Sequence, residues 1–193
     1  MATSIRAALA FSLAIGTSQT CAAEVAGVTL APSVQVSDTT LTLNGAGLRR
    51  KVFFKVYVMG LYVAHSSPDA SALLAEPGPK RVAIHMLRDV GADTFTNALR
   101  EGIRDNHTEA QAAALEPRVK QLAAVMSAVG EAKDGMNIAL DWIPGSGTAV
   151  VIDGAARGEP IAGEDFYRAL LRIWLGDNPV QTDLKKALLG AQD

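Results

Sequence analysis

The sequence predicts an α+β fold, in which a mainly antiparallel sheet is covered by helices. Two observations carry this prediction. Strand-like and helix-like segments come in blocks, as strands, helices, strands and again helices. This order lacks the regular strand–helix alternation that parallel sheets require. The sequence also contains no internal repeat and no linker-like stretch, and a chain of this length is enough for one sizeable core.

The first third reads as strands. The stretch GVTLAPSVQVSDTTLTLNGAG alternates small apolar and polar residues between turn signals. The apolar run 48–64 follows, and we expect it to be a strand. Because side chains alternate along a strand, one face would carry Arg49, Lys51, Phe53, Lys55, Tyr57, Met59 and Leu61. The other face would carry Arg50, Val52, Phe54, Val56, Val58 and Gly60. We expect this second, mostly apolar face to pack against helices, and the mixed first face to form the wall of an amphipathic cleft.

The cations in this run have a simpler alternative explanation. Lysine and arginine on an exposed edge strand discourage aggregation, and this interpretation suits Arg50 and Lys51 best. Arg49 follows two glycines, Gly45 and Gly47, which predict a bend and a close approach of the backbone to the sheet interior. Arg49 is therefore the cation that we expect to have a function.

The rest of the chain reads as one strand, then helices, then a block of strands and finally two closing helices. KRVAIHMLRDV (80–90) reads as a strand, and Asp93 or Thr94 could cap the helix that follows. A capping box, Thr108 with Gln111, opens a segment that Pro117 should divide or kink before it ends at Gly130. Residues 135–163 predict a meander with turns at 144–145 and 153–154, and GEDFYRALLRIWLG and TDLKKALLG predict two closing helices.

The N-terminus predicts export. MATSIRAALAFSLAIGTSQTCAAE has an early cation, a short apolar run and small residues before a cut expected after Ala23. We therefore expect a signal peptide at 1–23, one domain at 24–193, and a periplasmic or secreted protein. Cys21 is the one cysteine, so the mature chain would contain no disulfide. Its apolar runs fall short of the roughly 18 residues of a membrane span. The net charge of −2 argues against nucleic acid as a partner.

The common cofactor and metal motifs are missing from the sequence. Residues 145–147 (GSG) lack the spacing of a hydrolase nucleophile elbow, and residues 45–47 (GAG) lack the third glycine of a dinucleotide fingerprint. The histidines, at 65, 85 and 107, are scattered and have no cysteine partner. We therefore predict neither a metal nor a cofactor.

Two sets of motifs resemble a known family. GAG-x-R followed by F-K-x-Y-x-x-G-x-Y resembles the chalcone isomerase-like superfamily, and LDWIPGSGTAVVIDGAARGEPIAGEDFYRALLRIWLG with TDLKKALLG resembles its bacterial, exported branch. The resemblance covers nearly the whole predicted mature chain. It implies an open-faced β-sandwich, in which a large antiparallel sheet is covered by a layer of helices, with a ligand cleft between them.

The resemblance also implies site residues. The catalytic arginine of the isomerases matches Arg49, and their threonine on the next strand falls at Tyr57. Their tyrosine, asparagine and late threonine fall at Phe95, near Gly102 and at Ile173, so four of the five polar positions differ here. An isomerase that stabilises an oxyanion would lack most of its donors.

The fatty-acid-binding branch needs only an arginine and a tyrosine, which Arg49 and Tyr57 would supply. Phe95, Ile173 and Trp142 would then line the cleft for the tail. In a straight strand Arg49 and Tyr57 would lie about 26 Å apart, so this site requires a sharp bend between Arg50 and Phe54.

Three hypotheses follow. The first is an exported, noncatalytic binding protein for a hydrophobic carboxylate such as a fatty acid. The second is an intramolecular lyase or isomerase acting on an unknown substrate. The third is a structural or partner-binding protein with a closed cleft, in which Arg49 pairs with a carboxylate such as Asp89. Polar donors opposite Arg49 would favour chemistry, and an apolar wall would favour binding.

Overall fold

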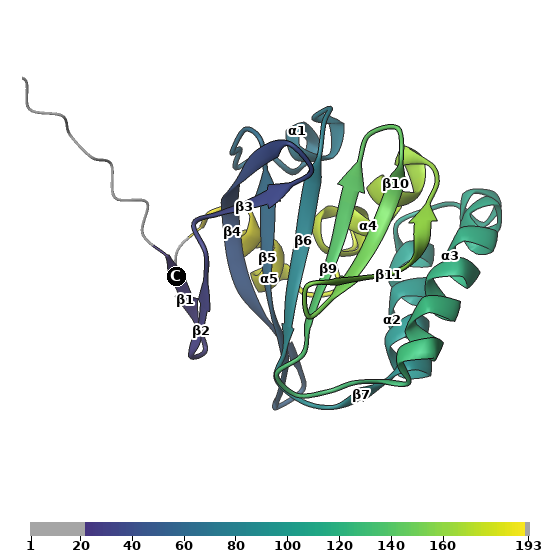
Figure 1. Cartoon of the computed structure of the whole chain (residues 1–193), viewed down its shortest axis with the longest axis horizontal. Helices are drawn as coiled ribbons and strands as arrows, with labels where there is room; N and C mark the ends of the chain where they lie inside the picture. The colour runs from purple at the N-terminus through teal and green to yellow at the C-terminus, as the bar shows by residue number, and fades with distance from the viewer. Residues whose placement is uncertain (1–21, 192–193) are drawn as a thin grey trace, which may run out of the picture.

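The computed structural model describes residues 22–191, which form a large antiparallel sheet with helices packed on one face (Figure 1). The sheet has seven strands in the order β11-β10-β9-β6-β5-β4-β3. Their bounds are β3 Ser33–Val36, β4 Thr39–Lys51, β5 Phe54–Val63, β6 Lys80–Met86, β9 Asn137–Ile143, β10 Gly147–Ile152 and β11 Ala155–Ile161. Two small ribbons pair β1 (Ala23–Val25) with β2 (Val28–Leu30) and β7 (Val90–Gly91) with β8 (Glu131–Ala132). The helices are α1 Ala70–Ala75, α2 Ala92–Asp105, α3 Glu109–Val129, α4 Glu164–Leu175 and α5 Thr182–Leu188. The predicted α+β class is confirmed.

The main core lies between the sheet and the helices. Alternate residues of the central strands enter it, such as Met59, Leu61, Val82, Ile84, Ile138 and Leu140. Helix α4 packs behind the middle of the sheet and contributes Phe166, Leu170 and Trp174 to the same core (Figure 1). A smaller apolar cluster of Val36, Leu41 and Tyr62 covers part of the other face. The sheet therefore has one face under helices and one more open face.

The run 48–64 is a hairpin and not one strand. β4 ends at Lys51, β5 begins at Phe54, and Val52 and Phe53 form a two-residue turn. The expectation that Val52 and Phe54 would be buried is wrong, because they are 78% and 60% exposed at the turn. The helices also cover the opposite face of β5 from the one expected: the face with Met59 enters the main core, while Gly60 lies against Leu30 on the open side.

Strand β4 continues through Gly45 and Gly47, and the expected irregularity is a shift in its register with β5 between Leu43 and Gly45. The role of the two glycines is close packing, because a Cβ at Gly45 would lie 2.2 Å from the carbonyl oxygen of Ala187, and one at Gly47 would lie 2.8 Å from Leu184. Both contacts are with α5. The glycines therefore let α5 lie directly on β4, next to the strand segment that carries Arg49.

One helix prediction needs correction, and a second is narrowed to one of its two outcomes. Helix α2 begins at Ala92 without a side-chain cap, earlier than Asp93 or Thr94 would place it. Its first N–H donates to the carbonyl of Gly130 (3.0 Å), the residue that ends α3 just before β8. Helix α3 is a single helix that contains Pro117, with buried Leu115 and Val119 on either side, so of the two expected outcomes the division into two helices is excluded.

The other local predictions are confirmed. Thr108 and Gln111 form the capping box, and Gly130 ends α3 with a φ of 86°. Strands β9, β10 and β11 form the meander, followed by the two closing helices. The predicted signal peptide lies outside the described residues, apart from Ala22 and Ala23. Within the described range 22–191, no helix has the length and apolar character to cross a bilayer.

Candidate functional site

A cavity of about 680 Å³ lies between one end of the sheet and helices α2 and α4. Its wall is mostly apolar and includes Val56, Met86, Phe95, Leu99, Ile173, Trp174 and Val180. Arg49, Lys51 and Arg88 also line it, as do Asp89, Glu101 and Asp105. The last two are exposed and lie where the cavity meets solvent. A cavity of this size, with apolar walls and a few polar groups, is typical of small-molecule sites.

Arg49 and Tyr57 meet in this cavity because the hairpin brings them together. They are directly paired across β4 and β5, whereas the next pair is Arg50 with Lys55. Val56 is thus an extra residue, and this β-bulge lies beside the arginine. Directly opposed residues of an antiparallel pair lie about 4.5–5.5 Å apart. The sharp bend that the sequence required between Arg50 and Phe54 is present as the turn at Val52.

Gln181 holds the bulge in place from the segment before α5. Its side-chain oxygen accepts from the backbone N–H of Arg50 (2.8 Å) and from Nη1 of Arg49 (3.3 Å), and its amide donates to the carbonyl of Leu48 (3.0 Å). Arg49 also donates to the carbonyl of Arg50. Among the described residues Arg49 makes no salt bridge. The guanidinium is therefore positioned by neutral partners, and its charge is left for an anion.

The expected alternative partner of Arg49, Asp89, is used elsewhere. Its carboxylate accepts from the backbone N–H of Asp134 (2.8 Å) and pairs with Lys133 (3.4 Å). These contacts, led by the backbone hydrogen bond, lower the pKa of Asp89 below its ordinary value. Asp89 thus belongs to the loops beside the cavity and does not neutralise Arg49.

Tyr57 is oriented by a tryptophan. Nε1 of Trp174 donates to the hydroxyl oxygen of Tyr57 at 2.9 Å. Because an indole N–H can only donate, the hydroxyl is the acceptor in this bond and keeps its own proton. Burial raises the pKa of Tyr57, while Trp174 and Arg49 act in the opposite direction. The hydroxyl is therefore neutral near pH 7 and can donate a hydrogen bond to a ligand.

The far wall is formed where α2 crosses α4. A Cβ at Gly102 would lie 2.7 Å from Cγ2 of Ile173, so the two helices approach each other closely at this pair. Both residues are buried. These are two of the positions matched to polar residues of the isomerases, and here they contact each other. A larger side chain at Gly102 could not fit beside Ile173, so this wall is apolar for a steric reason.

The structure therefore brings together four of the five predicted ligand-binding residues. Arg49, Tyr57, Phe95 and Ile173 all line the cavity. Trp142 does not line it. It lies on β9 opposite Lys80, at the other end of β6 from Met86, and its ring is 6.0 Å from that of Tyr167.

Two residues of the site were missed in the sequence. Trp174 has the helical spacing of the core residues around it, and this spacing indicates that it is buried. The spacing gives no sign that the indole N–H reaches the hydroxyl of Tyr57. Gln181 comes just before a short helix and matches no motif. Its link to β4 joins residues 132 positions apart and has no local signal.

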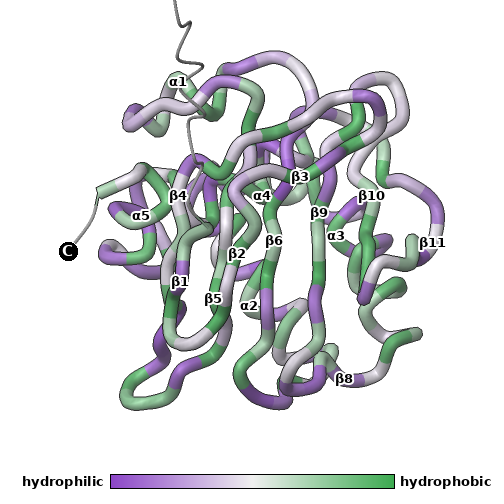
Figure 2. Tube along the Cα trace, turned by 60° about the vertical axis from the view of Figure 1, so that its left-hand side comes forward, coloured by the Kyte–Doolittle hydropathy of each residue, from purple (hydrophilic) through white to green (hydrophobic). Residues whose placement is uncertain are grey.

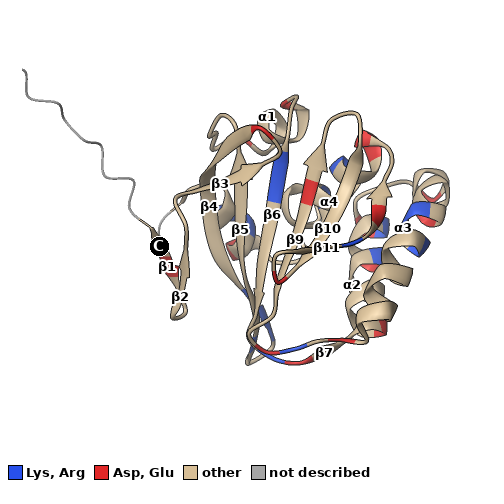
Figure 3. Cartoon of the chain, viewed as in Figure 1, with Lys and Arg blue, Asp and Glu red and all other residues tan. Residues whose placement is uncertain are grey.

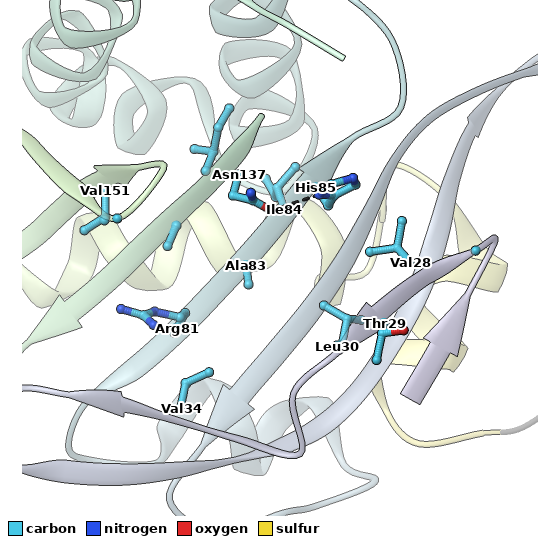
Figure 4. Close-up of a pocket in the computed structure, with 14 residues that line it drawn as sticks. Val28, Thr29, Leu30, Val34, Arg81, Ala83, Ile84, His85, Asn137 and Val151 are labelled. Atoms are coloured by element: carbon cyan, nitrogen blue, oxygen red, sulfur yellow. Dashed lines mark hydrogen bonds between the residues drawn. The ribbon is translucent and has the colours of Figure 1, made fainter. Parts of the chain in front are cut away.

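A second cavity, of about 640 Å³, lies on the open face of the sheet under the β1–β2 ribbon (Figure 4). Its charged group, Arg81, and its histidine, His85, are already paired. Arg81 makes a bidentate ion pair with Asp141 (2.6 and 2.5 Å), seen as neighbouring blue and red segments of β6 and β9 in Figure 3. His85 contacts the side chain of Asn137 at 2.8 Å (Figure 4). This cavity offers a ligand no free charge, so we assign the site to the cavity with Arg49.

The fold and the cavity define an α+β protein with a ligand-sized space between an antiparallel sheet and its helices. The family model described as chalcone isomerase-like matches residues 22–190, and the chain belongs to this family. Among solved structures it is similar to a fatty-acid binding protein from Arabidopsis thaliana. The TM-score is 0.68 at 17% identity, over 84% of this chain and 92% of that one. At this identity the likeness shows a shared fold. No curated protein matches the sequence.

Proposed function

We propose that this chain is an exported, noncatalytic binding protein for a hydrophobic carboxylate such as a fatty acid, and that it belongs to the bacterial, exported branch of the family. The observation that carries the proposal is the pairing of Arg49 with Tyr57 in an apolar cavity. A guanidinium that pairs with no carboxylate among residues 22–191, together with a neutral hydroxyl donor, suits a carboxylate head group. The similar fold of a fatty-acid binding protein supports this choice of ligand.

The wall opposite the arginine favours binding over catalysis. Phe95, Gly102 and Ile173 have no side-chain donor, and the contact between Gly102 and Ile173 leaves no space for a larger polar group. A reaction that builds an oxyanion would depend on several donors aimed at it. Of the five matched positions, Arg49 and Tyr57 keep a side-chain donor, which suffices to hold a carboxylate.

The tail and the head group would contribute differently. Burying a twelve-carbon tail gives roughly 10 kcal/mol before association costs, at about 0.8 kcal/mol per methylene. A charge-assisted hydrogen bond adds about 1.5–3 kcal/mol. The cavity wall would therefore supply most of the affinity, and Arg49 the preference for a carboxylate.

Two measurements test the ligand. Native mass spectrometry of protein purified from cells, followed by lipid extraction, should reveal a bound fatty acid. Calorimetric titration of delipidated protein with dodecanoic acid should then show saturable binding. If delipidated protein binds no fatty acid even at millimolar concentrations, the proposal is wrong and a structural role takes its place.

Export is tested separately. The mature protein should begin at or near Glu24 and be found in the periplasmic fraction or the medium. N-terminal sequencing of protein from fractionated cells checks both points. An intact N-terminus in the cytosolic fraction would contradict the exported part of the proposal without affecting the ligand.

A further inference from the structure

The tip of the β4–β5 hairpin presents three consecutive apolar side chains to solvent. Val52, Phe53 and Phe54 are 78%, 92% and 60% exposed, and they account for all the exposed large hydrophobic residues in the described part of the chain. Figure 2 shows this tip as a hydrophobic loop between two hydrophilic strand segments, at the lower left of the molecule. Single exposed apolar residues are common, but such a concentration at one projecting turn indicates an interaction surface.

The tip is held in a defined shape. Lys51 pairs with Phe54 on either side of the two-residue turn, and Val52 has a φ of 56°. A β-branched residue is strained in this left-handed region, where glycine would be relaxed. Turn geometry alone therefore does not account for valine, whereas an apolar contact outside the molecule would use its side chain.

Cations surround the base of the tip. Arg50 and Lys55 are paired directly across the two strands, and both are exposed. Like charges in such a pair destabilise a hairpin. In the described chain Arg50, Lys51 and Lys55 make no salt bridge. Arg88, from the next loop, lies 4.7 Å above the ring of Phe54. An anionic partner would relieve this repulsion.

Acidic residues occur nearby, on the β7 and β8 loops (Figure 3). Asp89 and Glu131 both pair with Lys133, and Asp134 donates its backbone N–H to Asp89. These groups form their own exposed cluster beside the hairpin. They do not pair with the hairpin cations, so the tip itself remains basic.

We propose that the hairpin tip docks onto an anionic phospholipid surface. Val52 and Phe53 would enter the boundary between head groups and acyl chains, and Arg50, Lys51 and Lys55 would contact the phosphates. The apolar side chains of Val52 and Phe53 lie at the end of the hairpin, and the cations lie one step further back along its strands. In a bilayer the apolar acyl chains likewise lie deeper than the anionic phosphates. This match favours a lipid surface over a protein partner.

The docking surface is continuous with the cavity. Lys51, Val52 and Phe54 line the cavity as well as the tip, whereas Phe53 does not. A docked tip would thus place the cavity next to the bilayer, where a fatty acid could pass between them. The passage of a fatty acid between bilayer and cavity rests on the proposed function, whereas docking does not. Because Phe53 belongs to the tip but does not line the cavity, its variants test docking separately from fatty-acid binding.

Co-sedimentation with vesicles tests docking. The unmodified protein should bind vesicles of equimolar phosphatidylglycerol and phosphatidylcholine, bind phosphatidylcholine alone much less, and lose affinity as salt is raised. Phe53→Ser should weaken partitioning about 10- to 100-fold. Lys51→Gln with Lys55→Gln should weaken it about 25-fold. Lys120→Gln, an exposed cation on α3, is the matched control and should have no effect.

Insertion has its own readout. Trp142 and Trp174 are 7% and 2% exposed, so a lipid brominated near its head group should not quench them. In Phe53→Trp the new indole should be quenched. Absence of binding to anionic vesicles, equal binding by Phe53→Ser, or no quenching of Phe53→Trp would each overturn the proposal. Phe53→Ser should keep its affinity for dodecanoic acid in vesicle-free buffer, so failure of docking and failure of fatty-acid binding are distinguishable.

Discussion

Arg49 and Tyr57 are eight positions apart in the sequence but directly opposite each other across the β4–β5 hairpin. The turn at Val52–Phe53 brings them together, and the bulge at Val56 lies beside the pair. Both side chains line the cavity, with Gln181 holding the arginine and Trp174 holding the tyrosine. This pair is the centre of the proposed binding site, and the predictions below test its parts.

Arg49→Ala should weaken dodecanoic acid binding by about 1.5–3 kcal/mol, roughly 10- to 150-fold, because a charge-assisted hydrogen bond is lost. Dodecanol should be affected much less, since its head group carries no charge. Lys120→Ala, which removes an exposed cation on α3 outside the cavity lining, is the control and should change little. Calorimetric titration of the three proteins against both ligands measures these effects. Equal losses for acid and alcohol would mean that Arg49 supports the fold and not the head group.

Tyr57→Phe should lower both affinity and stability. Loss of one hydrogen bond to the ligand should cost about 0.5–1.5 kcal/mol of binding, and the buried N–H of Trp174, left without its acceptor, should cost about 1–3 kcal/mol of unfolding free energy. Calorimetry and urea unfolding measure the two effects. Adding Trp174→Phe to Tyr57→Phe removes the orphaned donor, so the two stability losses should be less than additive. Strict additivity would argue against the hydrogen bond.

Gly102→Ala should destabilise the protein by about 1–3 kcal/mol, because its Cβ would overlap Ile173. In a helix without this contact the same change would stabilise by about 1 kcal/mol. In an Ile173→Ala background, which removes the overlapping carbons, the cost should disappear. Ile173→Val keeps both γ carbons and is the matched control that should not rescue. Urea unfolding of the single and double variants checks the pattern.

A chalcone should cyclise no faster with this protein than without it. The positions matched to three polar residues of the isomerases are Phe95, Gly102 and Ile173, and none of them offers a side-chain donor. The loss of chalcone absorbance, followed with and without protein, measures the rate. An acceleration that is abolished by Arg49→Ala would instead establish the isomerase alternative.

Stability should fall at alkaline pH through the tyrosines. Burial raises the pKa of Tyr57, Tyr62 and Tyr167, and it does so most for Tyr167. Unfolded tyrosines ionise near pH 10. The folded state keeps their protons longer, so their contribution to stability is present below about pH 10 and is lost as the pH rises through the raised values. Urea unfolding at about pH 8 and about pH 11 should therefore show a smaller loss for Tyr167→Phe than for the unmodified protein. An equal loss would contradict this account.

Much of the local structure was predictable because its signals are local. The capping box of Thr108 and Gln111, the glycine that ends α3 and the turns of the meander are set by residues a few positions apart. Arg49 could be singled out for a similar reason, since it follows Gly45 and Gly47 and stands at the arginine of the GAG-x-R motif. The family resemblance, carried by ordered motifs, correctly implied the open-faced sheet with its covering helices.

The tertiary structure decided what depends on distant partners. Val52 and Phe53 carry no turn signal, and the turn exists because β4 and β5 pair from Thr42 with Val63 to Lys51 with Phe54, which imposes a positive φ on a valine. Trp174 enters the site and Trp142 does not, because α4 crosses the sheet near Tyr57, while Trp142 lies at the opposite end of its strand pair. Helical spacing identifies Trp174 as a core residue, but only packing between segments more than a hundred residues apart places it against Tyr57.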